Sequence, residues 1–268
     1  MSIATVNGIN INYQVTGQGE PLLMLAGLAM AHDGWHYQVA YFKSQYQTIT
    51  FDNRGAGKSE KPAGAYSPKM LAEDTIQLMD YLKIKAAHVL GVSMGGLVAQ
   101  EIAINYPARI KKLILSSTWA CQDDDENGIT PLILAAAKLP IRNGAVRLVD
   151  ASMDKTFDRW FLLPVLKIQC RFMKETEAVG LMAQRDGVME YNSLDRLPSI
   201  KAPTLVITGT KDRIIKSTSS DTIARNIPHA RLVKIEKGSH SFFSEMHRVF
   251  NKEVLDFLKT GCISEKKE

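Results

Sequence analysis

The stretch HVLGVSMGGLVAQ, residues 88–100, changes from a strand pattern to a helix pattern at its centre. An apolar run ends in Gly91-Val92-Ser93-Met94-Gly95, and a helical pattern begins at once. A serine on such a strand-to-helix turn takes a strained conformation, and its glycine neighbours avoid a clash. The turn raises the hydroxyl at the carboxyl end of the sheet. We predict that Ser93 is a nucleophile; the alternative is a glycine-rich helix start that only packs.

A serine hydroxyl is a weak nucleophile until a base takes its proton, and the chain holds six histidines. We predict His240 as the base, because it lies in IEKGSHSFFSE, between a strand at 230–238 and the last helix. Catalytic groups gather in loops at that end of the strands. The alternative is a loop histidine that only forms a hydrogen bond. His88, which opens a buried strand, is predicted to be structural.

The base needs a carboxylate that fixes its tautomer and stabilises its charged form. Asp212, in the loop after the apolar run at 202–209, is predicted to supply it. Asp123 is the competing acid, but it lies several residues beyond the run at 110–117. The chain order serine, aspartate, histidine also matches the order that enzymes with this serine turn share.

A tetrahedral intermediate needs N–H donors that already face its oxyanion. The backbone N–H of Met94, directly after the nucleophile, is one predicted donor. The other is predicted in the loop after PLLMLAG, at Leu28. Since both are backbone groups, the side chains at these positions matter little.

Strand and helix patterns alternate along most of the chain. Asn7-Gly8 joins two alternating runs in a predicted hairpin over residues 3–17. Continuous apolar runs, typical of strands buried on both faces, follow at 20–27, 46–53, 86–93, 110–117 and 202–209. Helical patterns cover 67–84, with Ser67 as N-cap, and also 94–107 and 241–259. Together they predict an α/β fold with a doubly wound, mostly parallel sheet.

The alternation stops between residues 121 and 198, where only helical signals follow an acidic run. Because this stretch lies between two sheet strands, we interpret it as a helical cap inserted over one edge of the sheet. The predicted domains are a core of residues 1–120 and 199–268 and a cap of residues 121–198.

Composition argues against several classes of protein. Lys and Arg number 33 against 28 Asp and Glu, but they are scattered, so no nucleic-acid partner is predicted. Three cysteines, no two closer than 49 residues, predict neither a disulfide framework nor a zinc site. No signal peptide and no apolar run of membrane-spanning length is visible. We expect a cytoplasmic protein without a metal or a membrane partner, and its oligomeric state, a homo-oligomer included, stays open.

The loop FDNRGAGKSE, residues 51–60, ends like a nucleoside-triphosphate-binding loop. Such a loop needs a glycine five residues before the Gly of Gly-Lys-Ser, and counting back from Gly57 gives Asp52. The loop also leads into a Pro- and Gly-rich connection rather than a helix. We therefore predict that Asp52 and Arg54 form structural hydrogen bonds near the serine turn and that Lys58 lies on the surface.

With these residues placed, the sequence resembles the α/β-hydrolase superfamily over nearly its whole length. Within it, the chain is similar to the group of carboxylesterases, 3-oxoadipate enol-lactonases and cofactor-free haloperoxidases. The matching segments are LLMLAGLAMAHDGW, FDNRGAGKSE, HVLGVSMGG, TLVITGTKDRII and GSHSFFSE. The resemblance implies an eight-stranded sheet, a helical cap and no cofactor. Many relatives carry His-Gly where this chain has Ala26-Gly27, and serine rather than aspartate at the turn argues against epoxide hydrolases and haloalkane dehalogenases.

The resemblance implies a serine hydrolase that cleaves a small carboxylic ester or lactone through an acyl-enzyme. Haloperoxidase or perhydrolase chemistry and carbon–carbon bond hydrolysis use the same triad, and a non-enzymatic ligand receptor is a further alternative. Large apolar side chains are candidates for the substrate pocket, although the core is the commoner place for each of them. These candidates are Trp35, Trp119, Met153, Trp160, Phe161 and Met182.

Overall fold

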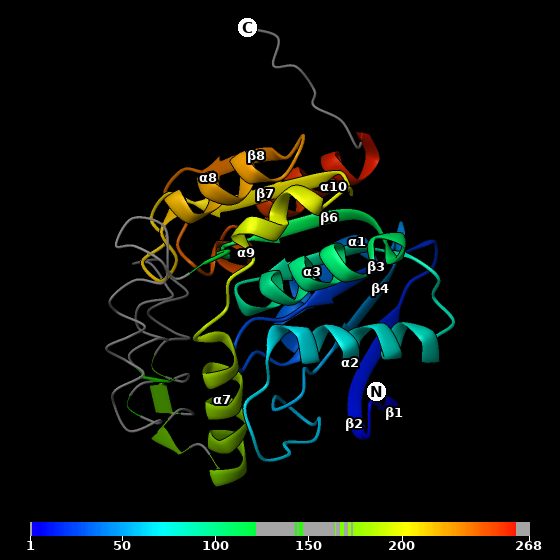
Figure 1. Ribbon diagram of the computed structural model, residues 1–268, viewed down its shortest axis with the longest axis vertical. Coiled ribbons are helices and arrows are strands. Elements are labelled where there is room, and N and C mark those ends of the chain that lie inside the picture. The colour runs from blue at the N-terminus through cyan, green and yellow to red at the C-terminus, as the bar shows by residue number, and fades with distance from the viewer. Residues whose placement is uncertain are drawn as a thin grey trace, which may run out of the picture.

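The computed structural model describes residues 2–121 and 174–260, together with a few single residues between 143 and 172. In these ranges eight strands form one sheet in the order β1-β2-β4-β3-β5-β6-β7-β8 (Figure 1). The strands are β1 (Ser2–Val6), β2 (Ile9–Thr16), β3 (Glu20–Leu25), β4 (Tyr46–Phe51), β5 (Ala87–Val92), β6 (Ile110–Ser116), β7 (Thr204–Gly209) and β8 (Arg231–Ile235). β2 pairs antiparallel with β1 and β4, and the other pairs are parallel. The predicted mostly parallel, eight-stranded sheet is confirmed.

Helices cover both faces of this sheet. The described helices are α1 (His36–Phe42), α2 (Pro68–Tyr81), α3 (Met94–Asn105), α7 (Glu175–Val188), α8 (Ser217–Asn226), α9 (Phe242–Glu245) and α10 (His247–Thr260). Short 3₁₀ segments are η1 (His32–Trp35), η2 (Pro107–Arg109) and η3 (Leu194–Ser199). α2, α3 and α8 pack on one face, and α1 and α10 pack on the other (Figure 1).

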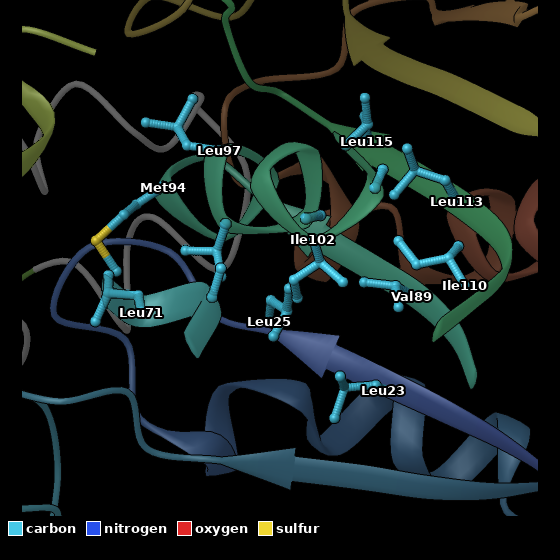
Figure 2. Packing of buried hydrophobic residues seen from close by; sticks show 14 of the residues in the cluster. Leu23, Leu25, Leu71, Val89, Met94, Leu97, Ile102, Ile110, Leu113 and Leu115 are labelled. Atoms are coloured by element: carbon cyan, nitrogen blue, oxygen red, sulfur yellow. The ribbon is translucent and has the colours of Figure 1, made fainter. Parts of the chain in front are cut away.

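The four apolar residues that end β3 show why the central strands are continuously apolar. Leu23 and Leu25 belong to the cluster under α2 and α3, whereas Leu22 and Met24 belong to the cluster under α1 and α10. Successive side chains of a strand point to opposite faces, and here helices cover both faces. Figure 2 shows the first cluster, in which the Met94 side chain reaches from α3 toward α2.

Two local predictions in the first third of the chain are confirmed. Asn7 and Gly8 have positive φ angles of 48° and 74°, as the tight turn between β1 and β2 requires. Ser67 caps α2, because its hydroxyl oxygen accepts a hydrogen bond from Met70 N at 3.2 Å.

The prediction of one helix over 241–259 is wrong, because the chain forms α9 and α10 with a break at Met246. Gln38 Nε2 donates to Phe243 O at 2.6 Å, and His247 Nδ1 bonds Ser244 O at 3.1 Å. These side chains bind carbonyl groups that a continuous helix would pair with later backbone N–H groups. One tertiary contact, from Gln38, and one local contact, from His247, therefore stabilise the break.

β6 and β7 are adjacent and parallel, so the chain between them forms a crossover connection. Its described part holds α7 and η3, and α7, at Glu175–Val188, confirms one part of the helical signal predicted between residues 121 and 198. Most of the predicted cap at 121–198 lies outside the described residues, so the domain division stays a prediction. Within the described ranges, none of the helices is long and apolar enough to cross a lipid bilayer.

His88, in β5, is buried; its Nε2 bonds Glu20 Oε2 at 3.2 Å, and its Nδ1 has no partner among the described residues. Burial lowers the pKa of His88 from 6.5, although the bond to Glu20 opposes this. Because the folded-state pKa of His88 is lowered, the contribution of neutral His88 to the free energy of unfolding is complete above pH 6.5 and is lost as the pH falls below 6.5. When the pH is lowered from about 7.5 to about 5, we expect the free energy of unfolding to fall less in His88→Gln than in wild type. Urea titrations measure this difference, and equal losses contradict it.

Candidate active site

Ser93 lies at the turn from β5 to α3 with φ 53° and ψ −120°. A residue with a Cβ atom rarely adopts a positive φ, so the surrounding structure must hold this turn. Ser93 N donates to Ser116 O at 2.9 Å, and Thr118 Oγ1 donates to Ser93 O at 2.8 Å. The end of β6 thus fixes the turn, and Ser93 itself stays partly exposed.

Gly91 and Gly95 lie where the surrounding backbone leaves no room for a Cβ atom. A Cβ atom on Gly91 would overlap the Gly95 carbonyl group, and one on Gly95 would overlap the Leu25 carbonyl group. The first turn of α3 therefore lies directly against the ends of β5 and β3. This close approach explains why the pattern around Ser93 has glycine on both sides.

The chain after β3 passes directly beside Ser93. A Cβ atom built on Gly27 would lie 3.4 Å from Ser93 Cβ. Leu28 follows, in a turn closed by a hydrogen bond from Met30 N to Gly27 O at 3.2 Å. Met94 is the first residue of α3, so its N–H has no acceptor within the helix. Both backbone positions flank Ser93, and their role as oxyanion donors stays a prediction.

His240 and Asp212 form a buried pair in the loops after β8 and β7. His240 Nδ1 lies 2.8 Å from Asp212 Oδ2, and the Asp212 side chain is fully buried. The other carboxylate oxygen, Oδ1, accepts from Ile214 N at 2.8 Å and Ile215 N at 2.9 Å. Because an ionised carboxylate only accepts hydrogen bonds, the imidazole proton belongs on Nδ1, and Nε2 carries the lone pair that a base needs.

Ser93, Asp212 and His240 each follow the carboxyl end of a parallel strand. β5, β6, β7 and β8 are consecutive neighbours in the sheet, and Lys211 N donates to Gly238 O at 2.8 Å between the last two loops. The carboxyl ends of parallel strands meet at one edge, so the sheet gathers the three predicted residues there. In the described part of the chain, no group of three or more His, Cys, Asp or Glu side chains could hold a metal ion.

The predicted pocket residues lie in different places. Trp35 is fully buried and packs on Phe243, with ring centroids 5.3 Å apart, in the cluster under α1 and α10. Trp119 is buried in the cluster under α2 and α3, and Met182 on α7 is 40% exposed. The structure does not bring these three side chains together. The other candidates, Met153, Trp160 and Phe161, lie outside the described residues.

Asp52, directly after β4, ties the loop at 51–60 to the chain that follows β3. Its Oδ1 accepts from His32 N at 2.7 Å and His32 Nδ1 at 2.9 Å, and its Oδ2 accepts from Asn12 Nδ2 and Lys58 N, each at 2.8 Å. Burial alone would raise the pKa of Asp52, but these donors lower it below its ordinary value. Asp52 is a structural hydrogen-bonding residue, as predicted, whereas its partners His32 and Asn12 were not predicted.

Arg54 makes a second buried link in this loop. Its Nε and Nη2 bind Asp74 of α2 at 2.8 Å and 2.7 Å. We expect Arg54→Met to lower the free energy of unfolding by about 3–5 kcal/mol, because a buried carboxylate loses its counter-ion. Lys252→Met, which breaks an exposed ion pair with Asp256, should leave the urea midpoint unchanged. Equal effects of the two substitutions would contradict the claim that loss of the buried ion pair destabilises the fold more than loss of the exposed one.

Comparison with known proteins decides the family. The model of the alpha/beta hydrolase fold family matches residues 20–245. This chain belongs to the α/β-hydrolase family. The matched range includes the positions of Ser93, Asp212 and His240. The resemblance inferred from the sequence motifs is confirmed, and the chain is an enzyme of this hydrolase superfamily.

Individual relatives of this α/β-hydrolase carry different activity names. The chain is 29% identical to 3-oxoadipate enol-lactonase 2 of Acinetobacter baylyi, over 95% of this chain and 95% of the relative. It is 30% identical to a protein of Mycobacterium tuberculosis named as a non-heme bromoperoxidase, over 93% of this chain and 97% of the relative. Among solved structures, the enol-lactonase from Burkholderia xenovorans matches with a TM-score of 0.82 and 29% identity, over 96% of this chain and 100% of that chain.

Proposed function

We propose that this enzyme hydrolyses a small carboxylic ester or lactone through an acyl-enzyme on Ser93. The observation that carries the proposal is the pair of His240 and Asp212, 2.8 Å apart, in loops at the same sheet edge as the serine turn. A carboxylate that two backbone N–H groups hold in place orients the imidazole with its basic nitrogen available. Such a base beside a strained serine supports nucleophilic attack on a carbonyl carbon.

Acylation begins when Ser93 Oγ attacks the carbonyl carbon and His240 Nε2 takes the hydroxyl proton. The carbonyl oxygen becomes an oxyanion, which the N–H groups of Leu28 and Met94 stabilise; loss of one such donor costs about 10²- to 10³-fold in rate. The bond to the alcohol oxygen then breaks, and that oxygen receives the proton from His240. The acyl group stays on Ser93 as an ester.

Water completes the cycle by the same route. His240 takes a proton from water as its oxygen attacks the acyl carbon, and the proton passes to Ser93 as the acid leaves. Asp212 stays ionised and stabilises the imidazolium in both halves of the cycle. With a lactone, the acid and the alcohol belong to one product. The two enol-lactonase relatives support a lactone among the substrates.

Perhydrolysis is a second candidate function, supported by the relative named as a bromoperoxidase. Hydrogen peroxide would then replace water as the group that attacks the acyl-enzyme. The products are a peracid and free Ser93, and the peracid can oxidise bromide outside the site. Ser93 and His240 play the same roles in both reactions, so hydrolysis and perhydrolysis are distinguished by their products.

A panel of short-chain p-nitrophenyl esters and of saturated and enol lactones tests the proposal. We expect hydrolysis without peroxide, and bromination in the presence of peroxide and bromide that is slower than hydrolysis. Bromination faster than hydrolysis would favour perhydrolysis. If the folded protein turns over no ester and no lactone, the proposed function is wrong.

A further inference from the structure

The turn that carries Leu28 holds an unfavourable backbone conformation. Ala29, its third residue, has φ 57°, and Met30 N closes the turn onto Gly27 O at 3.2 Å. A left-handed backbone costs a residue with a Cβ atom about 1–2 kcal/mol, which is why glycine usually takes this position. A contact from outside the turn must therefore favour the observed conformation.

Gln184, on α7, supplies that contact. It is fully buried, its Oε1 accepts from Ala29 N at 2.9 Å, and its Nε2 donates to Arg54 O at 2.7 Å. One side-chain amide thus joins three segments: the turn beside Ser93, the loop after β4, and α7. Its donor and acceptor are both satisfied only when all three segments are in place.

α7 gives this amide a rigid support, because small residues let the helix lie directly on the core. A Cβ atom on Gly180 would overlap the Gly55 carbonyl group, and one on Gly187 would overlap the Tyr66 backbone. Between these two contacts, Ala183 O accepts from Tyr66 N at 2.9 Å. The amide therefore projects from backbone that is held against the core.

We propose that Gln184 is a positioning residue that holds the oxyanion turn, residues 27–30, in its catalytic conformation. The inference rests on the proposed function, since it takes the Leu28 N–H as an oxyanion donor. Without Gln184, the peptide between Leu28 and Ala29 can rotate and bring Ala29 to a negative φ, which relieves the strain. That rotation changes the ψ angle of Leu28 and exchanges the positions of the Leu28 carbonyl oxygen and the Ala29 N–H, so the backbone that holds the Leu28 N–H beside Ser93 loses its fixed geometry.

Gln184→Met tests this role with a side chain of similar length that forms neither hydrogen bond. With p-nitrophenyl acetate as the probe, we expect kcat to fall about 10- to 100-fold, as misplacement of a catalytic group does, and KM to stay nearly unchanged. Labelling of Ser93 by a fluorophosphonate should slow by a similar factor, because the phosphonyl oxygen takes the oxyanion position. An unchanged kcat overturns the proposal.

Gln100→Met is the matched control. Gln100 is also fully buried; its amide donates to Trp119 O at 2.9 Å and accepts from Ser193 Oγ at 2.7 Å, outside the oxyanion turn. We expect this variant to lower the thermal unfolding midpoint about as much as Gln184→Met does and to keep its kcat. An equal loss of kcat in both variants overturns the proposal, because it shows a general effect of losing a buried amide.

Ala29→Gly adds a measurement that a purely structural role would not change. Glycine adopts a positive φ without steric cost, so in the Gln184→Met background it should restore kcat by about threefold or more. Absence of any recovery overturns the proposal. If Gln184→Met does not fold, Gln184→Asn replaces it, because the shorter amide cannot span Ala29 and Arg54.

Failure of the proposed function has a different signature. If the wild-type protein neither hydrolyses p-nitrophenyl acetate nor reacts with the fluorophosphonate, the serine mechanism fails, and the inference fails with it. If the wild type is active and labelled, and Gln184→Met matches it in both assays, only the inference fails.

Discussion

Ser93→Ala is expected to lose ester or lactone hydrolysis by on the order of 10⁵- to 10⁶-fold in kcat. The substitution removes the only atom that forms the acyl-enzyme in the proposed mechanism, so the oxyanion donors alone remain. The fold should survive, because the bonds that hold the turn, Ser93 N to Ser116 O and Thr118 Oγ1 to Ser93 O, use backbone atoms of Ser93. Steady-state kinetics and thermal unfolding of the variant measure the two effects separately.

Ser117→Ala is the matched control for this substitution. Ser117 follows β6, is buried and has φ 43°, so it shares with Ser93, on the neighbouring strand, a positive φ angle. We expect this variant to keep its kcat. A Ser93→Ala protein whose activity stays within about tenfold of wild type would exclude Ser93 as the nucleophile, since a true nucleophile contributes far more.

Asp212→Asn is expected to lower kcat about 10⁴-fold with little change in KM. The asparagine oxygen can still accept from Ile214 N and Ile215 N, so the amide nitrogen must face His240 Nδ1. A donor at that position moves the imidazole proton to Nε2, and His240 can then no longer take the proton of Ser93.

A surface carboxylate provides the control for the Asp212 substitution. Asp221 pairs with Lys234 at 2.8 Å on a partly exposed part of the surface, so Asp221→Asn should keep full activity. If Asp212→Asn is as active as Asp221→Asn, another group must orient His240, and the assignment of the acid is wrong.

Sequence reasoning succeeded where the signal is local. The glycines around Ser93, the Asn7-Gly8 turn and the Ser67 cap each lie within a few residues of the structure that they specify. The alternation of apolar runs and helical patterns likewise reports the faces that each element buries, which is enough to predict the sheet.

Contacts between distant segments carry no such signal. Asp52 bonds Asn12 across 40 residues, and Gln184 bonds Ala29 across 155 residues. A single glutamine in a helix has no spacing partner, so its role appears only when the tertiary structure is known. The break at Met246 escaped prediction for the same reason, because the contact from Gln38 to Phe243 O spans 205 residues.

The most direct test of the central claim is the detection of the acyl-enzyme itself. The protein is mixed with excess p-nitrophenyl acetate, quenched with acid within the first turnovers, digested with trypsin and examined by mass spectrometry. The account predicts one acetyl group per chain, on Ser93 in the tryptic peptide of residues 86–109, formed as fast as the burst of p-nitrophenol. Turnover with no acetyl group on that peptide, or with acetylation of a different residue at the burst rate, would contradict it.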